Sequence, residues 1–283
     1  MTRWPAPAKL NLFLHITGRR ADGYHALQTV FQLLDYGDEL EFDRREDGLV
    51  TRVNPLPGVP AETDLCVRAA RLLQQTTGVA GGVDIRLDKQ LPMGGGLGGG
   101  SSDAATTLLA LNGLWGCDLP REELAGLGAT LGADIPVFVT GHSAWGEGVG
   151  EKLSPLVLPP RWYVVIAPAV EISTAELFAA PELTRNCERI RISEFLAGAG
   201  TNVFEDLVRE RHADVSRALD WLDSRGGSVG PARLTGTGSC VFSAYHSANQ
   251  AAAVADAIPG KWKGFAARGI DRSPVEALLR AGE

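Results

Sequence analysis

The chain has 283 residues, of which 45% are hydrophobic and 22% are charged, an ordinary composition for a globular protein. This length exceeds that of a usual single core, so we expect two domains of about 150 and about 130 residues. The formal net charge is −7 and the sequence contains no basic cluster. A nucleic acid or an anionic membrane surface is therefore excluded as the expected partner.

The sequence also favours a cytoplasmic location. It contains no run of about 18 apolar residues and begins without an apolar segment flanked by basic residues, so neither membrane insertion nor export is expected. The four cysteines are widely spaced and show no metal-ligand pattern. Reduced, mostly buried thiols are typical of such a protein.

In the first half of the chain, hydrophobic periodicity and turn residues predict strands and helices in alternation. The expected strands are 9–16, 28–34, 38–42 and 83–87. The expected helices are 64–76, which Gly78 ends, and one from Pro120 to about Leu131. A charged turn is expected at 18–23 and a proline-rich loop at 54–60.

The second half begins after a proline-rich segment, 157–160, which we take as the linker. We therefore expect two parts, 1–156 and 157–283. The second part is predicted to contain strands at 162–167, 232–234, 240–244 and 264–267, and helices at 202–211, 215–223 and 249–257. Strands and helices mixed in both halves predict an α+β protein with two lobes.

Residues 92–105 carry the strongest functional signal and read Pro-Met-Gly-Gly-Gly-Leu-Gly-Gly-Gly-Ser-Ser-Asp-Ala-Ala. The glycines let the backbone lie against a ligand. Ser101, Ser102 and Asp103 are helix-capping types, and an apolar helical pattern follows them. A glycine loop that leads into a helix N-terminus aims unpaired N–H groups and the positive end of the helix dipole at one point. This arrangement predicts an anion site, most often for phosphate.

Other interpretations of this loop are weaker. A flexible linker would not run directly into a well-patterned helix. Gly94-x-Gly96-x-x-Gly99 satisfies the dinucleotide fingerprint, but it lies deep in the chain without the expected ribose-binding acid. A P-loop is excluded because no Gly-Lys-Ser/Thr ends the loop.

Two charged residues in apolar surroundings are candidates for chemistry. Lys9 and Asn11 share one face of the first predicted strand, where Lys9 either lies at an edge or points at an anion. Asp134 precedes Pro136 at the start of a short helix, where it either caps the helix or serves as a base for a hydroxyl group. The segment Leu234–Phe242, with two glycines and three hydroxyl residues, is either a plain hairpin or a turn that approaches a ligand.

In combination, the segments 7–12, 92–105 and 234–240 resemble the three signatures of the GHMP kinase superfamily. Further segments resemble the branch that acts on a cytidine diphosphate-linked methylerythritol: 18–25, 33–38, 131–138 and 146–151. The resemblance implies a two-lobed fold, with an N-terminal lobe like domain 2 of ribosomal protein S5 and a C-terminal ferredoxin-like lobe. It departs from the family at Asp64, where an asparagine is usual near the adenosine site.

The resemblance also implies roles for individual residues. Asp134 would be the catalytic carboxylate, with Lys9 as its charge partner. The substrate would be bound by Asn11, Tyr24, His25, Phe178 and Thr174, with Tyr24 and Phe178 stacking on the cytosine and His25 forming hydrogen bonds to its edge. ATP would be bound by Pro92, Met93, Gly94, Gly95, Gly96, Leu97, Gly98, Gly99, Gly100, Ser101 and Ser102. A turn near the phosphates would be formed by Thr235, Gly236, Thr237 and Gly238.

The implied reaction uses ATP and Mg²⁺ to phosphorylate the C2 hydroxyl of the substrate, and the implied state is a monomer or weak homodimer. The metal ligands are not identified by any motif. Alternatives are a kinase of this superfamily that acts on mevalonate, homoserine or galactose, or a small-molecule sensor on the same fold. A dinucleotide-dependent oxidoreductase is the most distant alternative.

Overall fold

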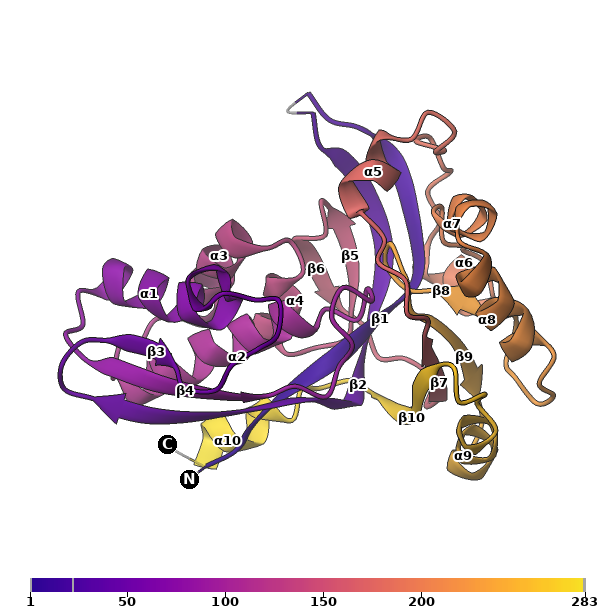
Figure 1. Cartoon of the computed structure of the whole chain (residues 1–283). Coiled ribbons are helices and arrows are strands. Elements are labelled where there is room, and N and C mark those ends of the chain that lie inside the picture. The colour runs from indigo at the N-terminus through magenta and orange to yellow at the C-terminus, as the bar shows by residue number, and fades with distance from the viewer. Residues whose placement is uncertain (1, 22, 282–283) are drawn as a thin grey trace.

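The computed structural model describes residues 2–21 and 23–281. Asp22, in the predicted charged turn 18–23, lies outside the described residues. So do residue 1 and residues 282–283, at the outer ends of the two expected parts. The fold is built on two long N-terminal strands that run through both parts of the molecule (Figure 1).

These two strands, β1 (Trp4–Arg19) and β2 (His25–Arg45), form an antiparallel pair. The prediction of separate strands at 28–34 and 38–42 is wrong, because β2 is continuous through Gly37. At Gly37 the strands approach so closely that a Cβ atom would lie 2.1 Å from the carbonyl oxygen of Ala6. The glycine therefore marks a close backbone approach inside a strand and not a turn.

The first part adds a sheet edge and a layer of helices around this pair (Figure 1). Its remaining elements are β3 (Val50–Arg52), a 3₁₀ turn η1 (Ala61–Thr63), α1 (Leu65–Thr77), β4 (Gly82–Asp88), α2 (Gly99–Leu114), α3 (Arg121–Leu131), α4 (Ile135–Thr140), β5 (Ala144–Gly148) and β6 (Lys152–Pro155). The predicted helix 64–76 is confirmed: the Asp64 side chain accepts a hydrogen bond from the N–H of Cys66, and Gly78 ends the helix in the left-handed conformation.

The second part follows the predicted order of elements closely. It contains β7 (Trp162–Ala167), α5 (Thr174–Ala179), α6 (Ile192–Leu196), α7 (Glu205–Arg211), α8 (Ala213–Asp223), β8 (Arg233–Leu234), β9 (Val241–Tyr245), α9 (Ala248–Asp256), β10 (Lys263–Ile270) and α10 (Val275–Ala281). The helix predicted at 202–211 begins only at Glu205, because the Asn202 side chain accepts from the N–H of Phe204 and holds a turn before the helix.

One mixed sheet connects the two parts, in the order β3-β4-β2-β10-β7-β9-β8, with β1 and β5 also paired to β2. The main core lies between the β3-β4-β2-β1 region and the helices α1–α4, and a second core lies under α7 and α8. Val275 of α10 belongs to the first core, so the chain returns to its starting part, where α10 packs against β1 and α2 (Figure 1). The division at 156/157 stays a prediction.

Two further observations bear on the expected cellular setting. Within residues 2–21 and 23–281, no helix combines the length and the apolar character that crossing a bilayer requires. The four cysteines are free thiols: Cys66 and Cys240 are buried, whereas Cys117 and Cys187 are partly exposed.

Candidate active site

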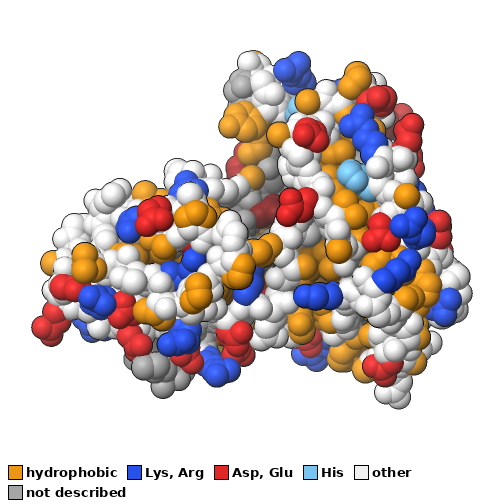
Figure 2. Space-filling view, viewed as in Figure 1, with side chains coloured by type: hydrophobic (Ala, Val, Ile, Leu, Met, Phe, Trp, Pro, Cys, Tyr) orange, Lys and Arg blue, Asp and Glu red, His pale blue; other side chains and the backbone are white. Residues whose placement is uncertain are grey.

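A cavity of about 920 Å³ lies between the two parts of the molecule. Figure 2 shows the surface hollowed between the body that carries α1–α4 and the upright part that carries α5. The structure brings nearly all the predicted site residues to this cavity. Its walls include Lys9, Asn11, Tyr24, His25, Pro92 to Ser101, Asp134, Thr174, Phe178 and Gly236 to Gly238. Ser102 and Thr235 are not among the residues that line it.

The glycine loop joins β4 to α2 and directs the N-terminus of this helix at the cavity. The helix begins at Gly99, with Gly98 as N-cap at φ 72°, a left-handed conformation that suits glycine. Its first intrahelical bond runs from the N–H of Ser102 to the carbonyl of Gly98. Because Gly98 has no side chain, it cannot cap the N–H groups that precede Ser102, and these point toward the cavity end of the helix.

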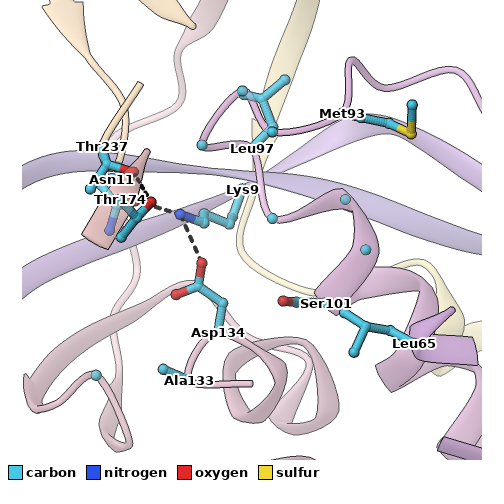
Figure 3. Close-up of a pocket in the computed structure, with 18 of the residues that line it drawn as sticks. Lys9, Asn11, Leu65, Met93, Leu97, Ser101, Ala133, Asp134, Thr174 and Thr237 are labelled. Carbon is cyan, nitrogen blue, oxygen red and sulfur yellow. Dashed lines mark hydrogen bonds and ion pairs between the residues drawn. The ribbon is translucent and has the colours of Figure 1, made fainter. Parts of the chain in front are cut away.

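The prediction that Ser101 and Ser102 start this helix is therefore wrong by two residues. The reason is the conformation of Gly98, which turns the chain into the helix before either serine is reached. Ser101 still faces the cavity (Figure 3). Ser102 is fully buried, and its hydroxyl has no hydrogen-bond partner among the described residues.

Thr235 connects the third predicted segment to the other two. It is fully buried, and its hydroxyl accepts the N–H of Asn11 at 3.0 Å and donates to the carbonyl of Gly96 at 3.3 Å. At Gly96, φ is +79° and a Cβ atom would lie 2.3 Å from the carbonyl oxygen of Thr235. The turn 235–240 is thus more than a plain hairpin between β8 and β9, since its backbone packs directly on the glycine loop.

Lys9 and Asp134 form the charged centre of the cavity (Figure 3). The Lys9 ammonium lies 3.1 Å from Asp134 Oδ2 and donates to Asn11 Oδ1 at 2.5 Å. The Lys9 side chain is 3% exposed, whereas that of Asp134 is 36% exposed to the cavity. Asn11 is itself held by a hydrogen bond from its amide to the hydroxyl of Thr29. The lysine is therefore not an edge residue, because it is buried against two polar partners.

The structure rules out the capping interpretation of Asp134. It occupies the N-cap position of α4, but its side chain makes no capping hydrogen bond there. Pro136 in the first turn lacks an N–H group, so it removes one of the donors that a cap would satisfy. The carboxylate is directed at Lys9 (Figure 3), where it can orient a hydroxyl group and accept its proton.

One end of the cavity is lined by the residues predicted to hold a base. The rings of His25 and Phe178 are 5.0 Å apart and inclined by 30°, and Phe178 packs edge-on against Phe204. Tyr24 is 67% exposed at the rim. Burial, with the Arg185 and Arg19 cations, lowers the pKa of His25, and its buried Nε2 has no partner among the described residues.

A buried charge network beside the glycine loop was missed from the sequence. Asp38 Oδ1 accepts the N–H groups of Gln90 and Leu91, and its Oδ2 lies 2.5 Å from the Lys89 ammonium. Lys89 also contacts Asp103 Oδ2 at 2.8 Å, so it joins the strand that enters the loop to the helix that leaves it. The signals were a lysine placed just before the loop, Asp38 at the end of the segment 33–38, and Asp103 among the capping residues, but nothing in the sequence joined them.

The charges in this network are strongly perturbed by burial. Burial raises the pKa of Asp103 to about 8; the Lys89 ammonium opposes this shift, and the nearby Asp38 carboxylate adds to it. Burial works against the charge of Lys89, but the attraction of Asp103 and Asp38 outweighs it and raises the pKa of Lys89. The ammonium therefore persists beside the helix N-terminus, where the two carboxylates offset its charge.

The other end of the cavity is apolar. Its walls include Met93, which was predicted with the glycine loop, and four residues that were missed from the sequence: Leu56, Val59, Leu65 and Leu87. In Figure 3, Leu65 and Met93 lie on the opposite side of Lys9 and Asp134 from Thr174 and Thr237. The cavity therefore has two ends that meet at the Lys9–Asp134 pair.

This protein combines a helix N-terminus that favours anions with a buried lysine–carboxylate pair, in a two-part α+β fold. This combination is typical of small-molecule kinases. The model of the GHMP kinase N-terminal domain matches residues 64–142, and that of the GHMP kinase C-terminal domain matches residues 181–264. A crystal structure of a mevalonate kinase is similar in fold, with a TM-score of 0.68 at 18% identity over 96% of this chain and all of that one.

Proteins that are more similar to this chain identify one family within this class. A protein of Halorhodospira halophila named 4-diphosphocytidyl-2-C-methyl-D-erythritol kinase is 57% identical over 98% of this chain and 96% of its own length. A protein of Nitrosococcus oceani with the same name is 57% identical over 96% of each chain. A crystal structure of 4-(cytidine 5′-diphospho)-2C-methyl-D-erythritol kinase has a TM-score of 0.83 at 33% identity, over 95% of this chain and all of that one. The chain belongs to the GHMP kinases and, within them, to the 4-diphosphocytidyl-2-C-methyl-D-erythritol kinase family. It is an ATP-dependent kinase with the two-lobed GHMP fold.

Proposed function

We propose that this protein transfers the γ-phosphoryl group of ATP to the C2 hydroxyl of 4-diphosphocytidyl-2-C-methyl-D-erythritol, in the non-mevalonate route to isopentenyl diphosphate. The observation that carries the proposal is the position of the Lys9–Asp134 pair between the glycine loop and the His25–Phe178 end of one cavity. The family membership supports the choice of substrate. The protein works in the cytoplasm as a monomer or weak homodimer.

The substrate lies with its cytosine at the end formed by Tyr24, His25 and Phe178. An aromatic face holds a base by stacking, and the buried Nε2 of neutral His25 supplies a hydrogen-bonding group for its edge. From this end the diphosphate and the sugar alcohol extend toward Asn11 and Asp134. The C2 hydroxyl then meets the carboxylate at the centre of the cavity.

ATP occupies the opposite end. Its phosphates lie against the glycine loop and the N-terminus of α2, where backbone N–H groups and the helix dipole favour negative charge. Its base lies toward the apolar walls that include Leu56, Val59 and Leu65. In this arrangement the γ-phosphate reaches the Lys9–Asp134 pair from the side opposite the acceptor.

The transfer requires little covalent chemistry from the protein. The hydroxyl oxygen forms a bond to the γ-phosphorus while the bond from this phosphorus to the bridging oxygen breaks, and its electron pair leaves with ADP. Asp134 orients the hydroxyl and takes its proton. The buried Lys9 ammonium keeps the carboxylate charged and offsets charge that develops on the transferring group.

Magnesium fits the oxygen groups that face the glycine loop. Mg²⁺ uses one or two protein oxygens together with substrate phosphates and water, so a dedicated cluster of acids is not required. The Ser101 hydroxyl faces the cavity and would be a suitable protein ligand, beside phosphate oxygens and water. When bound, the ion supplies neutralisation of phosphate charge.

The test is ADP release in a coupled assay with ATP and Mg²⁺. The cytidine compound is compared with mevalonate, homoserine and galactose as acceptors. Turnover with the cytidine compound alone is expected. Turnover with another alcohol would retain the Lys9–Asp134 chemistry but overturn the substrate, and ATP binding without turnover of any acceptor would favour the sensor alternative.

A further inference from the structure

The apolar end of the cavity is shaped by a segment with little regular structure. Between β3 and α1 the chain runs through residues 53–64, which contain three prolines and only the short turn η1. Leu56, Val59, Thr63 and Asp64 from this segment line the cavity. A segment of this kind does not hold one shape through its own backbone hydrogen bonds, so its contacts with the rest of the fold must fix it.

One buried guanidinium contacts this segment at three points. Arg52, at the end of the edge strand β3, donates from Nε to the carbonyl of Asn54 at 3.1 Å and from Nη2 to the carbonyl of Val59 at 2.8 Å. From Nη1 it donates to Asp64 Oδ2 at 2.5 Å. The fork of Arg52 therefore reaches the beginning, the middle and the end of the segment.

The carboxylate of Asp64 likewise uses both of its oxygens in hydrogen bonds. Asp64 Oδ1 accepts the N–H of Cys66 at 2.7 Å and thereby caps α1. The side chains of Arg52 and Asp64 are only 5% and 4% exposed, so solvent screens this ion pair weakly. At its start the segment is also fixed to β4, because the Asn54 side chain pairs with the N–H and the carbonyl of Leu87.

We propose that the Arg52–Asp64 ion pair is a positioning element for ATP: it holds residues 54–63 in the shape that contacts the base and ribose. The inference rests on the proposed function, which places the nucleotide at this end of the cavity. Neither residue is catalytic, since Arg52 does not line the cavity and both Asp64 oxygens already accept hydrogen bonds. A buried ion pair is a weak source of net stability but imposes a single geometry on the groups it joins.

The test compares ligand binding in two conservative variants, Asp64→Asn and Arg52→Lys. Asp64→Asn keeps the volume and an acceptor for the α1 cap but loses the charge that faces Arg52. Arg52→Lys keeps the charge but cannot form the three-point fork. Asp84→Asn is the matched control, because Asp84 on β4 also pairs with an arginine, Arg45, and lies outside the cavity lining.

Calorimetric titrations with ADP and, separately, with the cytidine substrate give the two dissociation constants. We expect each variant to weaken ADP binding about tenfold, the order of one charge-assisted contact. Binding of the cytidine substrate and kcat at saturating ATP should stay within about twofold of the wild type. The control should match the wild type for both ligands.

Two outcomes would overturn the proposal: unchanged ADP binding in both variants, or equal weakening of both ligands, which would indicate a general effect on folding. A failure of the proposed function would look different. In that case the wild-type protein itself would not bind the cytidine compound, whereas ADP binding would still respond to the two substitutions.

Discussion

The carboxylate of Asp134 lies 3.1 Å from the ammonium of Lys9, although Asp134 begins a short helix and Lys9 lies in the first strand. The Lys9 backbone N–H also donates to the carbonyl of Leu97 in the glycine loop, at 2.9 Å. The acid, the lysine and the phosphate-binding loop are thus fixed relative to one another through one residue. Such preorganisation is what phosphoryl transfer requires of a protein.

Removal of the carboxylate should abolish most turnover. We expect Asp134→Ala to lower kcat by about 10²–10⁴-fold, the usual contribution of a positioned general base. The side chain does not cap α4, but it neutralises the buried Lys9 ammonium, so its removal should also lower the melting temperature. Steady-state kinetics and thermal melting check both statements, with Asp256→Ala on the exposed end of α9 as the control. Near-wild-type turnover would remove Asp134 from its role.

Two glycines of the loop should respond differently to alanine. Both have positive φ, +68° at Gly94 and +79° at Gly96, so each substitution costs about 1 kcal/mol in backbone strain. Only Gly96 has a neighbour in the way, the carbonyl oxygen of Thr235 at 2.3 Å, whereas a Cβ atom on Gly94 meets nothing within 4 Å. Gly96→Ala should therefore raise the KM for ATP by at least tenfold more than Gly94→Ala. Equal KM values for the two variants would contradict the packing of the third turn on the loop.

The Lys89 network should make stability depend on pH. Folding raises the pKa of Asp103 from 3.8 to about 8, so between these values the folded state binds the additional proton. The free energy of unfolding therefore decreases as pH rises through this window, by at most about 1.4 kcal/mol per pH unit. In Asp103→Asn this contribution is absent, so the variant should gain stability relative to the wild type between pH 5 and pH 8.

Urea denaturation of the two proteins at pH 5, 6.5 and 8 measures this difference. The amide still offers an oxygen to the Lys89 ammonium, so the variant should fold. A difference in unfolding free energy that stays constant over the three pH values would show that Asp103 does not titrate in this range.

His25 should discriminate between the two substrates. Burial and the neighbouring arginines lower its pKa, so the imidazole stays neutral at pH 7 and becomes protonated at a lower pH than an unperturbed histidine. The KM for the cytidine substrate should be flat from pH 8 to about 6.5 and rise in more acidic solution.

The variant His25→Gln isolates this role. It should raise the KM for the cytidine substrate about tenfold and leave the KM for ATP unchanged, since His25 and the glycine loop line opposite ends of the cavity. A parallel rise of both KM values would place His25 outside the base-binding end.

Much of the fold was predictable because the signals are local. Gly78 ends α1, Pro120 precedes α3, and the strand predicted at 162–167 is β7 without a change of bounds. Each of these depends on the backbone preferences of a few neighbouring residues. Gly37 shows the limit of such reasoning, because its meaning depends on the approach of another strand.

The candidate site shows the same difference between local signals and contacts made by distant parts of the chain. Sequence by itself determined the glycine loop and the presence of a lysine and a carboxylate in apolar surroundings. Only the tertiary structure decided that Asp134 faces Lys9 instead of capping α4 and that Thr235 is buried against Gly96. It also decided that Arg52 pairs with Asp64 and that Lys89 pairs with both Asp38 and Asp103. Backbone conformation is set largely by adjacent residues, whereas the pairing of buried charges depends on which distant strands and helices the folded core brings into contact.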